Sequence, residues 1–458
     1  AGMTGFLTEI RVARTIGSTM KLEIKKIIAG IKSTLLSTTI SEDIFPDVNL
    51  ALNRIAESSS LPGLQAELIE LLYQFTTAYL NTNQPILLQW LEHPLWKEMF
   101  KLEKINKTNQ KPNTYQLAMS HSALFNFSVT HYALGHHAHL KQMRDKNNER
   151  IVYSDCPAKI DYEAIQKLAN NLEQQEIFIN ETSENEIVSI LQEVHTAEYI
   201  NQVKKLSELS EQLGIRLPLD QWGDTFISPD SYKAALHAAV ITANIVNQAY
   251  QHNQSGLCVV RPPGHHAGTD FGEGFCIFNN VAVSIKKLIN QGANNLLILD
   301  IDAHHGNGTL NILSRHQNWA EKVTLYDFYD GKNYHGLNGV WPVDQANSVT
   351  RQMFDMSINH RDSTTILNQL SNILQHDFDF IVVSFGLDGH RNDPLGGGLG
   401  YDDQFYLTVI KQLQEKKPGK FALVLEGGYN TDTITRIINL GMPLINNENS
   451  TENPRRLA

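Results

Sequence analysis

Acidic and imidazole side chains alternate with apolar ones in the segment DIDAH, which ends at His304. Because side chains of an extended chain alternate between two faces, Asp300, Asp302 and His304 are expected to point the same way. Carboxylate oxygens and imidazole nitrogens are both good zinc ligands, and a catalytic zinc site uses three protein ligands with one open position. Two ligands from this segment need a third, for which Asp388, shortly after an apolar run, is the best candidate. The alternative is that these acids only cap the next helix.

Two adjacent histidines, His265 and His266, lie in the segment RPPGHHAG. Neutral imidazoles beside a reacting water can act as general base and acid, with the pKa set by a partner on the other ring nitrogen. Asp300, the acid left over from the ligand set, is a natural partner for one of them, and Asn307 could serve the other. The letters GHHA recur at residues 135–138 without a preceding apolar strand or a neighbouring Asp, so we interpret that copy as a surface feature of a helix or loop.

A tyrosine, Tyr429, follows two glycines at the end of the apolar run FALVL. The glycines permit a tight turn. A phenol hydroxyl can stabilise the oxyanion that forms as a carbonyl carbon becomes tetrahedral. This short motif is weak evidence alone, and it gains weight because the other motifs also follow apolar runs.

The elements that position these motifs are apolar segments that alternate with helical ones from about residue 160 onward. The expected strands are residues 257–260, 296–301, 323–328, 380–385 and 421–425, and the expected helices include 280–289 and 364–374. Buried strands that alternate with helices predict a parallel sheet in an α/β domain. In such sheets ligands bind beyond the carboxyl ends of the strands, so we expect the motifs to form one site.

The first part of the chain has a different pattern. Residues 3–115 are expected to form several short helices separated by prolines. One amphipathic face is marked by apolar residues at spacings of three and four: Leu64, Leu68, Leu71, Leu72 and Phe75. No catalytic spacing occurs there. We therefore expect an N-terminal helical region at 3–115, a catalytic domain at 116–445 and a polar tail at 446–458.

The composition limits the function classes. The 458 residues carry a net charge of −11, which disfavours direct nucleic-acid binding and is compatible with basic substrates such as lysine-rich tails or polyamines. Three cysteines without a CxxC motif exclude a disulfide scaffold and suit a reducing compartment. Neither an apolar stretch of membrane-spanning length nor a signal peptide is evident. We expect a cytoplasmic or nuclear protein without a membrane partner or, for a bacterial protein, delivery into a host cell.

Taken together, the motifs resemble the zinc-dependent histone deacetylase superfamily, which includes acetylpolyamine amidohydrolases and acetoin-utilisation-type proteins. The resemblance covers about residues 150–445 and rests on RPPGHHA, GFCIFNNVAV, DIDAHHGNGT, GLDGHRNDPLGG and LEGGY, in the family's order. The spelling is closer to class II and bacterial members than to class I. The resemblance implies an arginase/deacetylase-like three-layer α/β fold with a central, mainly parallel sheet, and hydrolysis of an N-acetyl amide to acetate and an amine.

The resemblance also implies roles for individual residues. Zn²⁺ would be held by Asp302, His304 and Asp388. The tandem imidazoles would be His265, paired with Asp300, and His266, paired with Asn307, and Tyr429 would bind the substrate carbonyl. The channel for the acyl-lysine would be lined by Gly274, Phe275 and Tyr334. A structural K⁺ would lie at the backbone carbonyls of Asp300, Asp302 and His304 and the hydroxyl of Thr324. The acid that clamps the substrate at the channel rim in this family corresponds to Asp220 or Asp224, and both stay open.

The leading hypothesis is therefore a zinc amidohydrolase that deacetylates N-acetyl-lysine in proteins such as histones. The first alternative is deacetylation of acetylpolyamines or other small amines. An alternative of another class is a catalytically weak scaffold that binds partners through its helical N-terminal region, and a manganese ureohydrolase is conceivable on fold grounds. The sequence predicts no oligomeric state.

Overall fold

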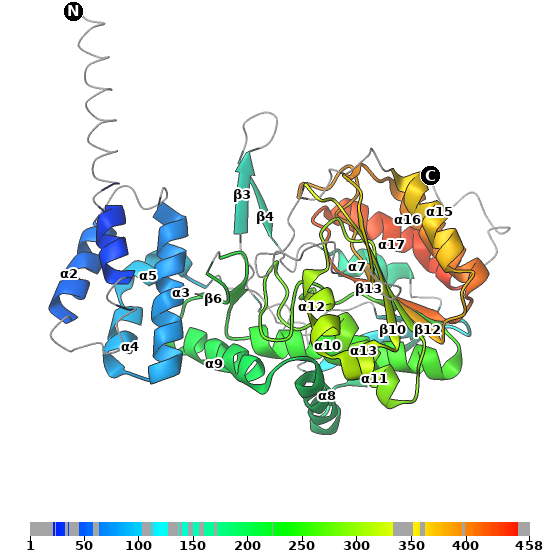
Figure 1. The fold of residues 1–458 in the computed structure, drawn as a ribbon, viewed down its shortest axis with the longest axis horizontal. Coiled ribbons are helices and arrows are strands. Elements are labelled where there is room, and N and C mark those ends of the chain that lie inside the picture. Colours follow the sequence, from blue (N-terminus) through cyan, green and yellow to red (C-terminus); the bar gives the residue numbers. More distant parts are fainter. Residues whose placement is uncertain are drawn as a thin grey trace, which may run out of the picture. The chain divides into compact units, whose positions relative to one another are not determined.

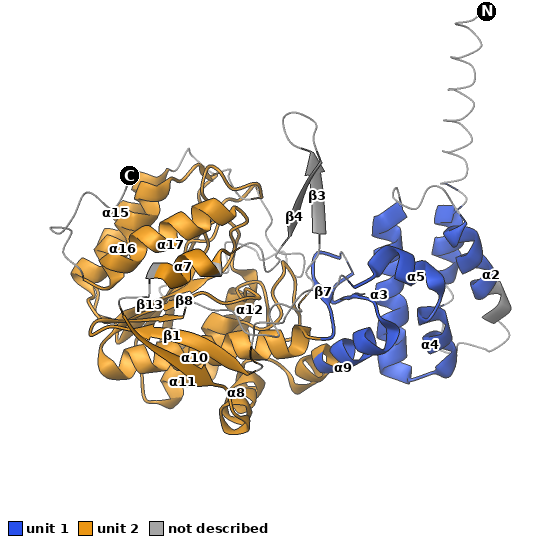
Figure 2. Cartoon of the chain, turned by 180° about the vertical axis from the view of Figure 1, so that it is seen from behind, with its two compact units in different colours: residues 1–104, 204–229 blue, residues 105–203, 230–458 orange. Residues whose placement is uncertain are grey.

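The structure is a computed structural model. It describes residues 22–447 except 23, 33–34, 36–44, 58–63, 103–110, 112, 127–135, 137–139, 145–149, 155–159, 169–171, 222, 333–350, 358–361 and 396–398. The chain forms two compact units (Figure 2). Unit 1 comprises residues 1–104 and 204–229, and unit 2 comprises residues 105–203 and 230–458.

Unit 1 is mainly helical. Its elements are α2 (Phe45–Ala56), α3 (Gln65–Thr82), α4 (Pro85–Leu91), α5 (Pro94–Phe100) and the short pair β6 (Leu217–Pro218) and β7 (Phe226–Ile227). The helices α4 and α5 each begin at a proline, which suits the first helical position because its missing N–H would be unbonded there anyway. The face predicted from spacings of three and four is buried: Leu64, Leu68, Leu71, Leu72 and Phe75.

Residues 204–229 belong to unit 1 although the sequence pattern groups them with the catalytic region. The ring of Phe226, on β7, lies 5.8 Å from that of Phe100 at the end of α5. The backbone N–H of Arg216 also donates a hydrogen bond to the carbonyl of Phe100. The contact is therefore both apolar and backbone-mediated, and neither component leaves a periodic signal in the sequence. The predicted domain boundaries stay predictions.

Unit 2 is built on a sheet of nine strands among its described residues (Figure 1). In spatial order they are β11 (Arg351–Asp355), β10 (Val323–Tyr329), β9 (Leu296–Asp300), β12 (Phe380–Phe385), β13 (Phe421–Leu425), β8 (Ser255–Cys258), β2 (Ala123–Asn126), β1 (Thr114–Met119) and β5 (Glu173–Phe178). Every pair from β11 to β2 is parallel, and β1 is antiparallel to both β2 and β5. The sheet is therefore mostly parallel, as predicted.

Helices cover both faces of this sheet, which gives three layers (Figure 1). One side has α8 (Glu181–Val194), α10 (Ser231–His252) and α11 (Asn280–Asn290), and the other has α7 (Tyr162–Leu168), α15 (Ser363–Ile373), α16 (Asp403–Lys416) and α17 (Thr431–Ile445). The remaining helices are α9 (Ala197–Leu213), α12 (Asn307–Arg315) and α13 (Gln317–Ala320). Several helices start with a side-chain cap from Asn or Asp, which fixes where each strand-to-helix loop ends, among them Asn180, Asn279, Asp362, Asp402 and Asn430.

The predicted central strands agree with the structure to within two residues, but four strands toward the two edges of the sheet were missed. β1 begins at Thr114, inside the region expected to be helical, and β2, β5 and β11 were not predicted. The polar segment after residue 139 contains the antiparallel pair β3 (Leu140–Arg144) and β4 (Arg150–Ser154), which was not predicted either. These strands are short or polar, so they lack the long apolar run that identifies a buried strand.

Candidate active site and metal centre

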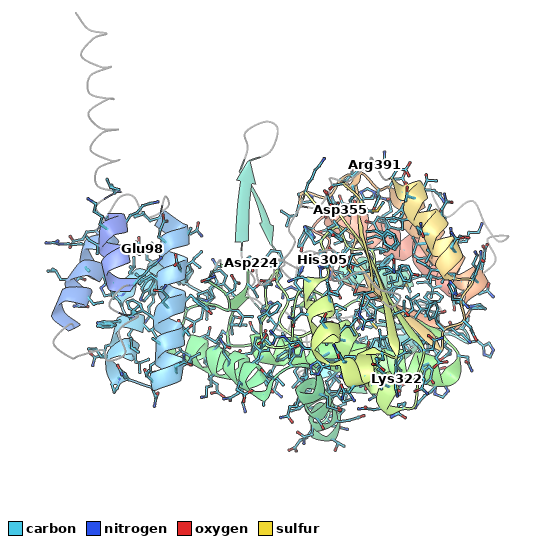
Figure 3. All side chains as sticks on the ribbon, in the orientation of Figure 1. Glu98, Asp224, His305, Lys322, Asp355 and Arg391 are labelled. Atoms are coloured by element: carbon cyan, nitrogen blue, oxygen red, sulfur yellow. The ribbon has the colours of Figure 1, made fainter. Side chains whose placement is uncertain are left out.

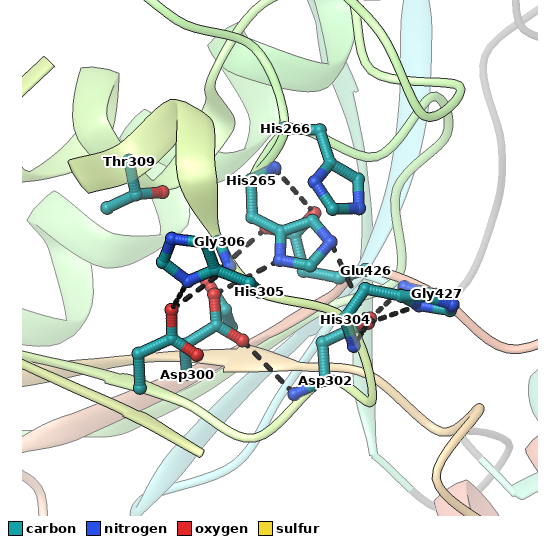
Figure 4. A network of polar contacts seen from close by, with 12 residues as sticks. His265, His266, Asp300, Asp302, His304, His305, Gly306, Thr309, Glu426 and Gly427 are labelled. Carbon is teal, nitrogen blue, oxygen red and sulfur yellow. Dashed lines mark hydrogen bonds and ion pairs between the residues drawn. The ribbon is translucent and has the colours of Figure 1, made fainter. Parts of the chain in front are cut away.

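The predicted motifs gather at one edge of the sheet. The strands β9, β12, β13 and β8 are neighbours and parallel, so their carboxyl ends lie side by side. In Figure 3, Lys322 marks the amino end of β10 and Asp355 the carboxyl end of β11, and His305 lies toward the carboxyl ends. The loops that follow these strands therefore bring the candidate residues together (Figure 4).

The three predicted zinc ligands form one buried cluster. The Nδ1 atom of His304 lies 3.0 Å from Oδ1 of Asp302 and 2.9 Å from Oδ2 of Asp388. One ligand atom from each residue lies within 4.8 Å of the others. Both carboxylates are fully buried, and 9% of His304 is exposed. Backbone N–H groups hold the two acids: Gly427 and His304 donate to Asp302, and Ala303 donates to Asp388.

The pKa values of the three residues are shifted because their ionisable groups are buried close together. Burial would lower the pKa of His304, but Asp388 and Asp302 outweigh it and raise this pKa to about 10. Burial and the neighbouring Asp302 raise the pKa of Asp388. Burial would also raise the pKa of Asp302, but His265 and His304 lower it. Two carboxylates held this close repel each other unless a cation lies between them.

This cluster fits a zinc ion. Its donors are two carboxylates and one imidazole, a set that zinc accepts and that leaves one coordination position open. Glycines at positions 386 and 427 make room for the acids, because a Cβ at Gly386 would collide with Asp302 and one at Gly427 would collide with Asp388. The two carboxylates thus occupy space that only glycine leaves free at positions 386 and 427.

The two adjacent histidines each contact the expected partner. Nδ1 of His265 lies 3.1 Å from Oδ2 of Asp300, and Nδ1 of His266 lies 2.7 Å from Oδ1 of Asn307. The two ring centroids are 4.0 Å apart. Nε2 of His265 lies 3.7 Å from Asp302, so the pair adjoins the candidate metal centre.

The pKa values of the two histidines are pushed in opposite directions. Burial would lower the pKa of His265, but the carboxylates of Asp302 and Asp300 raise it well above its ordinary value. Burial, together with the neighbouring His265 and His304, lowers the pKa of His266 well below its ordinary value. The two pKa values therefore move apart, which is the pattern by which two similar neighbouring groups come to differ in protonation.

The tyrosine and the channel residues lie beside each other. The ring centroids of Phe275 and Tyr429 are 5.8 Å apart, in an edge-on arrangement. Gly274 and Phe275 both have positive φ, +56° and +68°, and a Cβ on Gly274 would collide with the ring of His266. Tyr334 lies outside the described residues. The turn at 274–275 therefore adjoins His266 at Gly274 and places the ring of Phe275 against Tyr429.

Several buried acids at this edge were not predicted as site residues. Glu426 accepts hydrogen bonds from the backbone of Gly264 and His265 at 2.7 and 3.1 Å and fixes the turn before the histidines. Asp393 accepts from the backbone N–H of Tyr429 at 2.7 Å. Glu426 directly follows the predicted strand 421–425, which is the signal that could have identified it.

The acid Asp327 was missed because it lies inside a predicted strand. It is fully buried, and its carboxylate accepts from Nδ1 of His305 at 2.6 Å and from the N–H of Gly306 at 3.0 Å. It pairs in register with Asp300, whereas Thr324, the hydroxyl implied near a K⁺ ion, pairs with Leu297. The side chain of β10 that adjoins Asp300 is thus an acid.

One residue differs from its sequence interpretation, and one candidate for the rim acid has its hydrogen-bond partners in unit 1. His136, in the second GHHA copy, is buried rather than at the surface: its Nδ1 lies 2.6 Å from Oγ of Ser231. That interpretation was wrong for His136, and residues 137–138 lie outside the described part. Asp220, a candidate rim acid, is buried within unit 1, where it accepts from the backbone of Gly223 and Thr225.

Fold and site together define a mostly parallel α/β protein with an Asp–His–Asp centre at the carboxyl ends of its strands. Residues 154–442 match the family model "Histone deacetylase domain". The chain belongs to this family, and unit 2 has the arginase/deacetylase α/β fold. None of the described helices combines the length and apolar character needed to cross a membrane.

Three curated relatives illustrate the similarity. Histone deacetylase 5 of Arabidopsis thaliana is 31% identical over 263 residues, 54% of this chain and 39% of that protein. Histone deacetylase 6 of Caenorhabditis elegans is 32% identical over 240 residues, 49% of this chain and 24% of that protein. An uncharacterized protein of Synechocystis is 31% identical over 255 residues, 53% and 77% of the two chains. The chain thus spans about two fifths of the length of the plant relative.

The crystal structure of the HDA15 HD domain is 28% identical and aligns with a TM-score of 0.49, covering 57% of this chain and 74% of that one.

Proposed function

We propose that this protein is a zinc-dependent amidohydrolase that removes acetyl groups from N-acetyl-lysine in proteins such as histones, giving acetate and free lysine. The observation that carries the proposal is the buried cluster of Asp302, His304 and Asp388 beside the paired histidines, in a chain of the histone deacetylase family. Zinc held by these residues would supply a Lewis acid that polarises the acetyl carbonyl and lowers the pKa of a water molecule.

The histidines divide the proton transfers. His266 is neutral at pH 7 because its pKa is lowered by burial and by neighbouring imidazoles, so it can take the proton of the attacking water and pass it to the leaving amine. Its Nδ1 faces Asn307, which makes Nε2 the basic nitrogen. Asp302 and Asp300 raise the pKa of His265 against the effect of burial, which favours its protonated form, and in this proposal the ring stabilises negative charge on the reacting carbonyl oxygen.

The hydroxyl of Tyr429 donates a hydrogen bond to the same oxygen as its charge develops. Its backbone is anchored by Asp393, and its ring lies against Phe275. Phe275 and Gly274 form one wall of the channel that receives the lysine side chain. The net charge of −11 favours a cationic peptide around the acetylated lysine.

A monovalent cation at the implied K⁺ position is part of this proposal. Asp300 and Asp327 are both fully buried and adjacent in register. Oδ1 of Asp327 makes no hydrogen bond within the described part of the chain. Two buried acids need positive charge or hydrogen bonds nearby, and a cation bound by the carbonyls of Asp300, Asp302 and His304 would provide it.

The test compares substrates and metal states in one set of assays. Acetate release would be measured from acetyl-lysine peptides and from acetylated polyamines, with the metal content determined before chelation, after chelation and after zinc is restored. We expect one zinc per chain, loss of turnover on chelation and faster turnover of the peptides. Faster turnover of the polyamines would support the small-amine alternative, and no acetate from either substrate by the zinc-loaded protein would refute the deacetylase proposal.

A further inference from the structure

The side chain of Asn307 is held at both ends. Its Oδ1 lies 2.7 Å from Nδ1 of His266, and its Nδ2 donates a hydrogen bond to Oε1 of Glu273 at 2.6 Å. Asn307 and Glu273 are both fully buried. His266 thus contacts a neutral amide, and the carboxylate of Glu273 contacts the opposite end of that amide. The neighbouring His265 contacts the carboxylate of Asp300 directly.

The chemistry of the three groups fixes the position of one proton. An ionised carboxylate only accepts hydrogen bonds, so Glu273 selects the NH₂ end of the Asn307 amide. The carbonyl end must then face His266, and because a carbonyl oxygen also only accepts, Nδ1 of His266 must carry the proton. The lone pair of the neutral ring is then on Nε2. With the amide reversed, its NH₂ group would face His266 and require the lone pair on Nδ1.

We infer that Glu273 is a positioning residue that sets the orientation of the Asn307 amide and, through it, the tautomer of His266. This inference rests on the proposed function, in which Nε2 of His266 is the base. Burial of a carboxylate is costly unless it is hydrogen-bonded. A glutamate at position 273 therefore carries a desolvation cost that a side chain with only a packing role would not have. An apolar side chain would fill the space without that cost but would not orient the amide.

The position of Glu273 in the chain also connects this device to the channel. Its carbonyl accepts a hydrogen bond from the N–H of Cys276 at 2.9 Å, which closes the turn containing Gly274 and Phe275. Gly274 adjoins the ring of His266 so closely that a Cβ there would collide with it. One residue therefore begins the turn that packs against the face of His266 and also fixes its partner.

A swap of the two polar groups tests the inference. Asn307→Asp alone places two carboxylates in contact, and we expect kcat to fall by about ten- to a hundredfold, as for other groups that orient a site from behind. The double variant Glu273→Gln with Asn307→Asp restores a donor facing an acceptor. Its kcat should recover to within about fivefold of the original protein. Glu273→Gln alone should lose little, since its carbonyl can still accept from Asn307, whereas Glu273→Ala should lose as much as Asn307→Asp.

A second measurement reads the tautomer without activity. ¹⁵N NMR of histidine-labelled protein distinguishes Nδ1–H from Nε2–H, and the His266 signals are assigned by their loss in His266→Gln. We expect Nδ1–H in the original protein, with and without zinc, and a shift toward Nε2–H in Glu273→Ala. Should that variant not fold, the swap variants still provide the measurement.

Two outcomes would overturn the inference. One is an unchanged His266 tautomer in folded Glu273→Ala. The other is a kcat of the double variant that is as low as the kcat of Asn307→Asp alone. Failure of the proposed function looks different. In that case the zinc-loaded original protein releases no acetate from any substrate, while the NMR spectra still report whether Glu273 sets the tautomer.

Discussion

The centre of unit 1 and the strand-end region of unit 2 bury opposite kinds of side chain. In unit 1 the centre is aromatic: Phe75, Trp90, Trp96 and Phe100 are almost fully buried, with successive ring centroids 5.5 to 6.4 Å apart. In unit 2 the region beyond the strand ends is acidic: Asp300, Asp302, Asp388 and Glu426 are fully buried. Both regions are buried, but only the aromatic side chains of unit 1 gain free energy from burial without a compensating partner.

This difference separates stability from function. Removing aromatic surface from water is favourable, at about 25 cal/mol per Å², so the centre of unit 1 needs no further explanation. A buried carboxylate is unfavourable unless hydrogen bonds or opposite charge compensate it. The acids of unit 2 are compensated by backbone N–H groups, histidines and, in our proposal, a metal ion. Substitutions in the two units should therefore change different quantities.

The largest effect is expected from Asp388→Ala, which removes one of the three proposed zinc ligands. Because Asp388 contacts His304 at 2.9 Å, its loss opens the cluster, and we expect zinc to be lost and kcat to fall by more than about a hundredfold, beyond the usual effect of changing an outer partner of a metal ligand. Metal analysis and acetate release measure both. The control Asp402→Ala removes a helix cap and an exposed ion pair with Arg391, and should lower stability by about 1 kcal/mol with full zinc content. Full zinc and activity in Asp388→Ala would contradict the ligand assignment.

The converse experiment is Trp96→Ala in unit 1. Trp96 is fully buried between Phe75 and Phe100, so the cavity should lower the free energy of unfolding by about 3–5 kcal/mol. Zinc content and kcat should not change in the folded protein, because unit 1 holds no proposed ligand. The control Leu50→Ala changes a side chain that is 53% exposed and should leave stability unaltered.

A point substitution is the appropriate test of unit 1, because truncation before residue 115 would also remove the partners of residues 204–229. Urea unfolding and metal analysis provide the readouts. Zinc loss from folded Trp96→Ala would show that the separation between the two units is wrong.

An intermediate effect is expected from Tyr429→Phe, which removes one hydroxyl. Loss of an oxyanion donor typically raises the barrier by about 3 kcal/mol, or roughly a hundredfold in kcat. The donor acts as charge develops, so KM should change less than kcat. The control Tyr401→Phe removes a hydroxyl that makes no hydrogen bond within the described residues and should keep normal turnover. Normal turnover by zinc-loaded Tyr429→Phe would contradict the oxyanion role.

The sequence was sufficient to predict those parts of unit 2 that have a strong local pattern. The central strands are apolar runs, and Asp302, His304 and Asp388 follow them at positions that a parallel sheet necessarily brings together. By contrast, β1 and β5 form an antiparallel edge, and the residues of β5 are mostly exposed, so no apolar run marks that strand. Association of residues 204–229 with unit 1 depends on tertiary contacts and has no local signal.

The site residues that were missed share a physical feature. Glu426, Asp327 and Glu273 do not lie at the predicted ligand positions. Glu426 and Glu273 hold the proposed site residues His265 and Asn307 through hydrogen bonds, and Asp327 holds the loop at His305 and Gly306. A single acid in a sequence is most often at the surface, so its burial becomes evident only in three dimensions. The pairing of Asn307 with Glu273 also needs the loops after β8 and β9 to meet, which residue spacing does not predict.

The smallest expected effect concerns a carboxylate that is only partly buried, Glu184 on α8. It lies 2.8 Å from Nε2 of His237 and 2.6 Å from Nζ of Lys233. The hydrogen bond from His237 and the contact with Lys233 lower the pKa of Glu184 to about 2, although burial acts in the opposite direction. Unlike the acids at the strand ends, this group is fully compensated by cations and hydrogen-bond donors within the chain, so it should contribute to stability and not to turnover.

The sign of the pH dependence follows from the lowered pKa. The folded state holds the ionised carboxylate more firmly than the unfolded state, so the stabilisation is present above about pH 4.5 and is lost as the pH falls toward 2. Glu184→Gln should therefore lower the free energy of unfolding by about 1 kcal/mol at pH 7, and the difference from the original protein should shrink below pH 4.5. Urea unfolding from pH 7 to 3.5 measures it, with Glu415→Gln, from the exposed Lys411 pair, as the control. A difference that stays constant with pH would mean that Glu184 contributes by packing and not by charge.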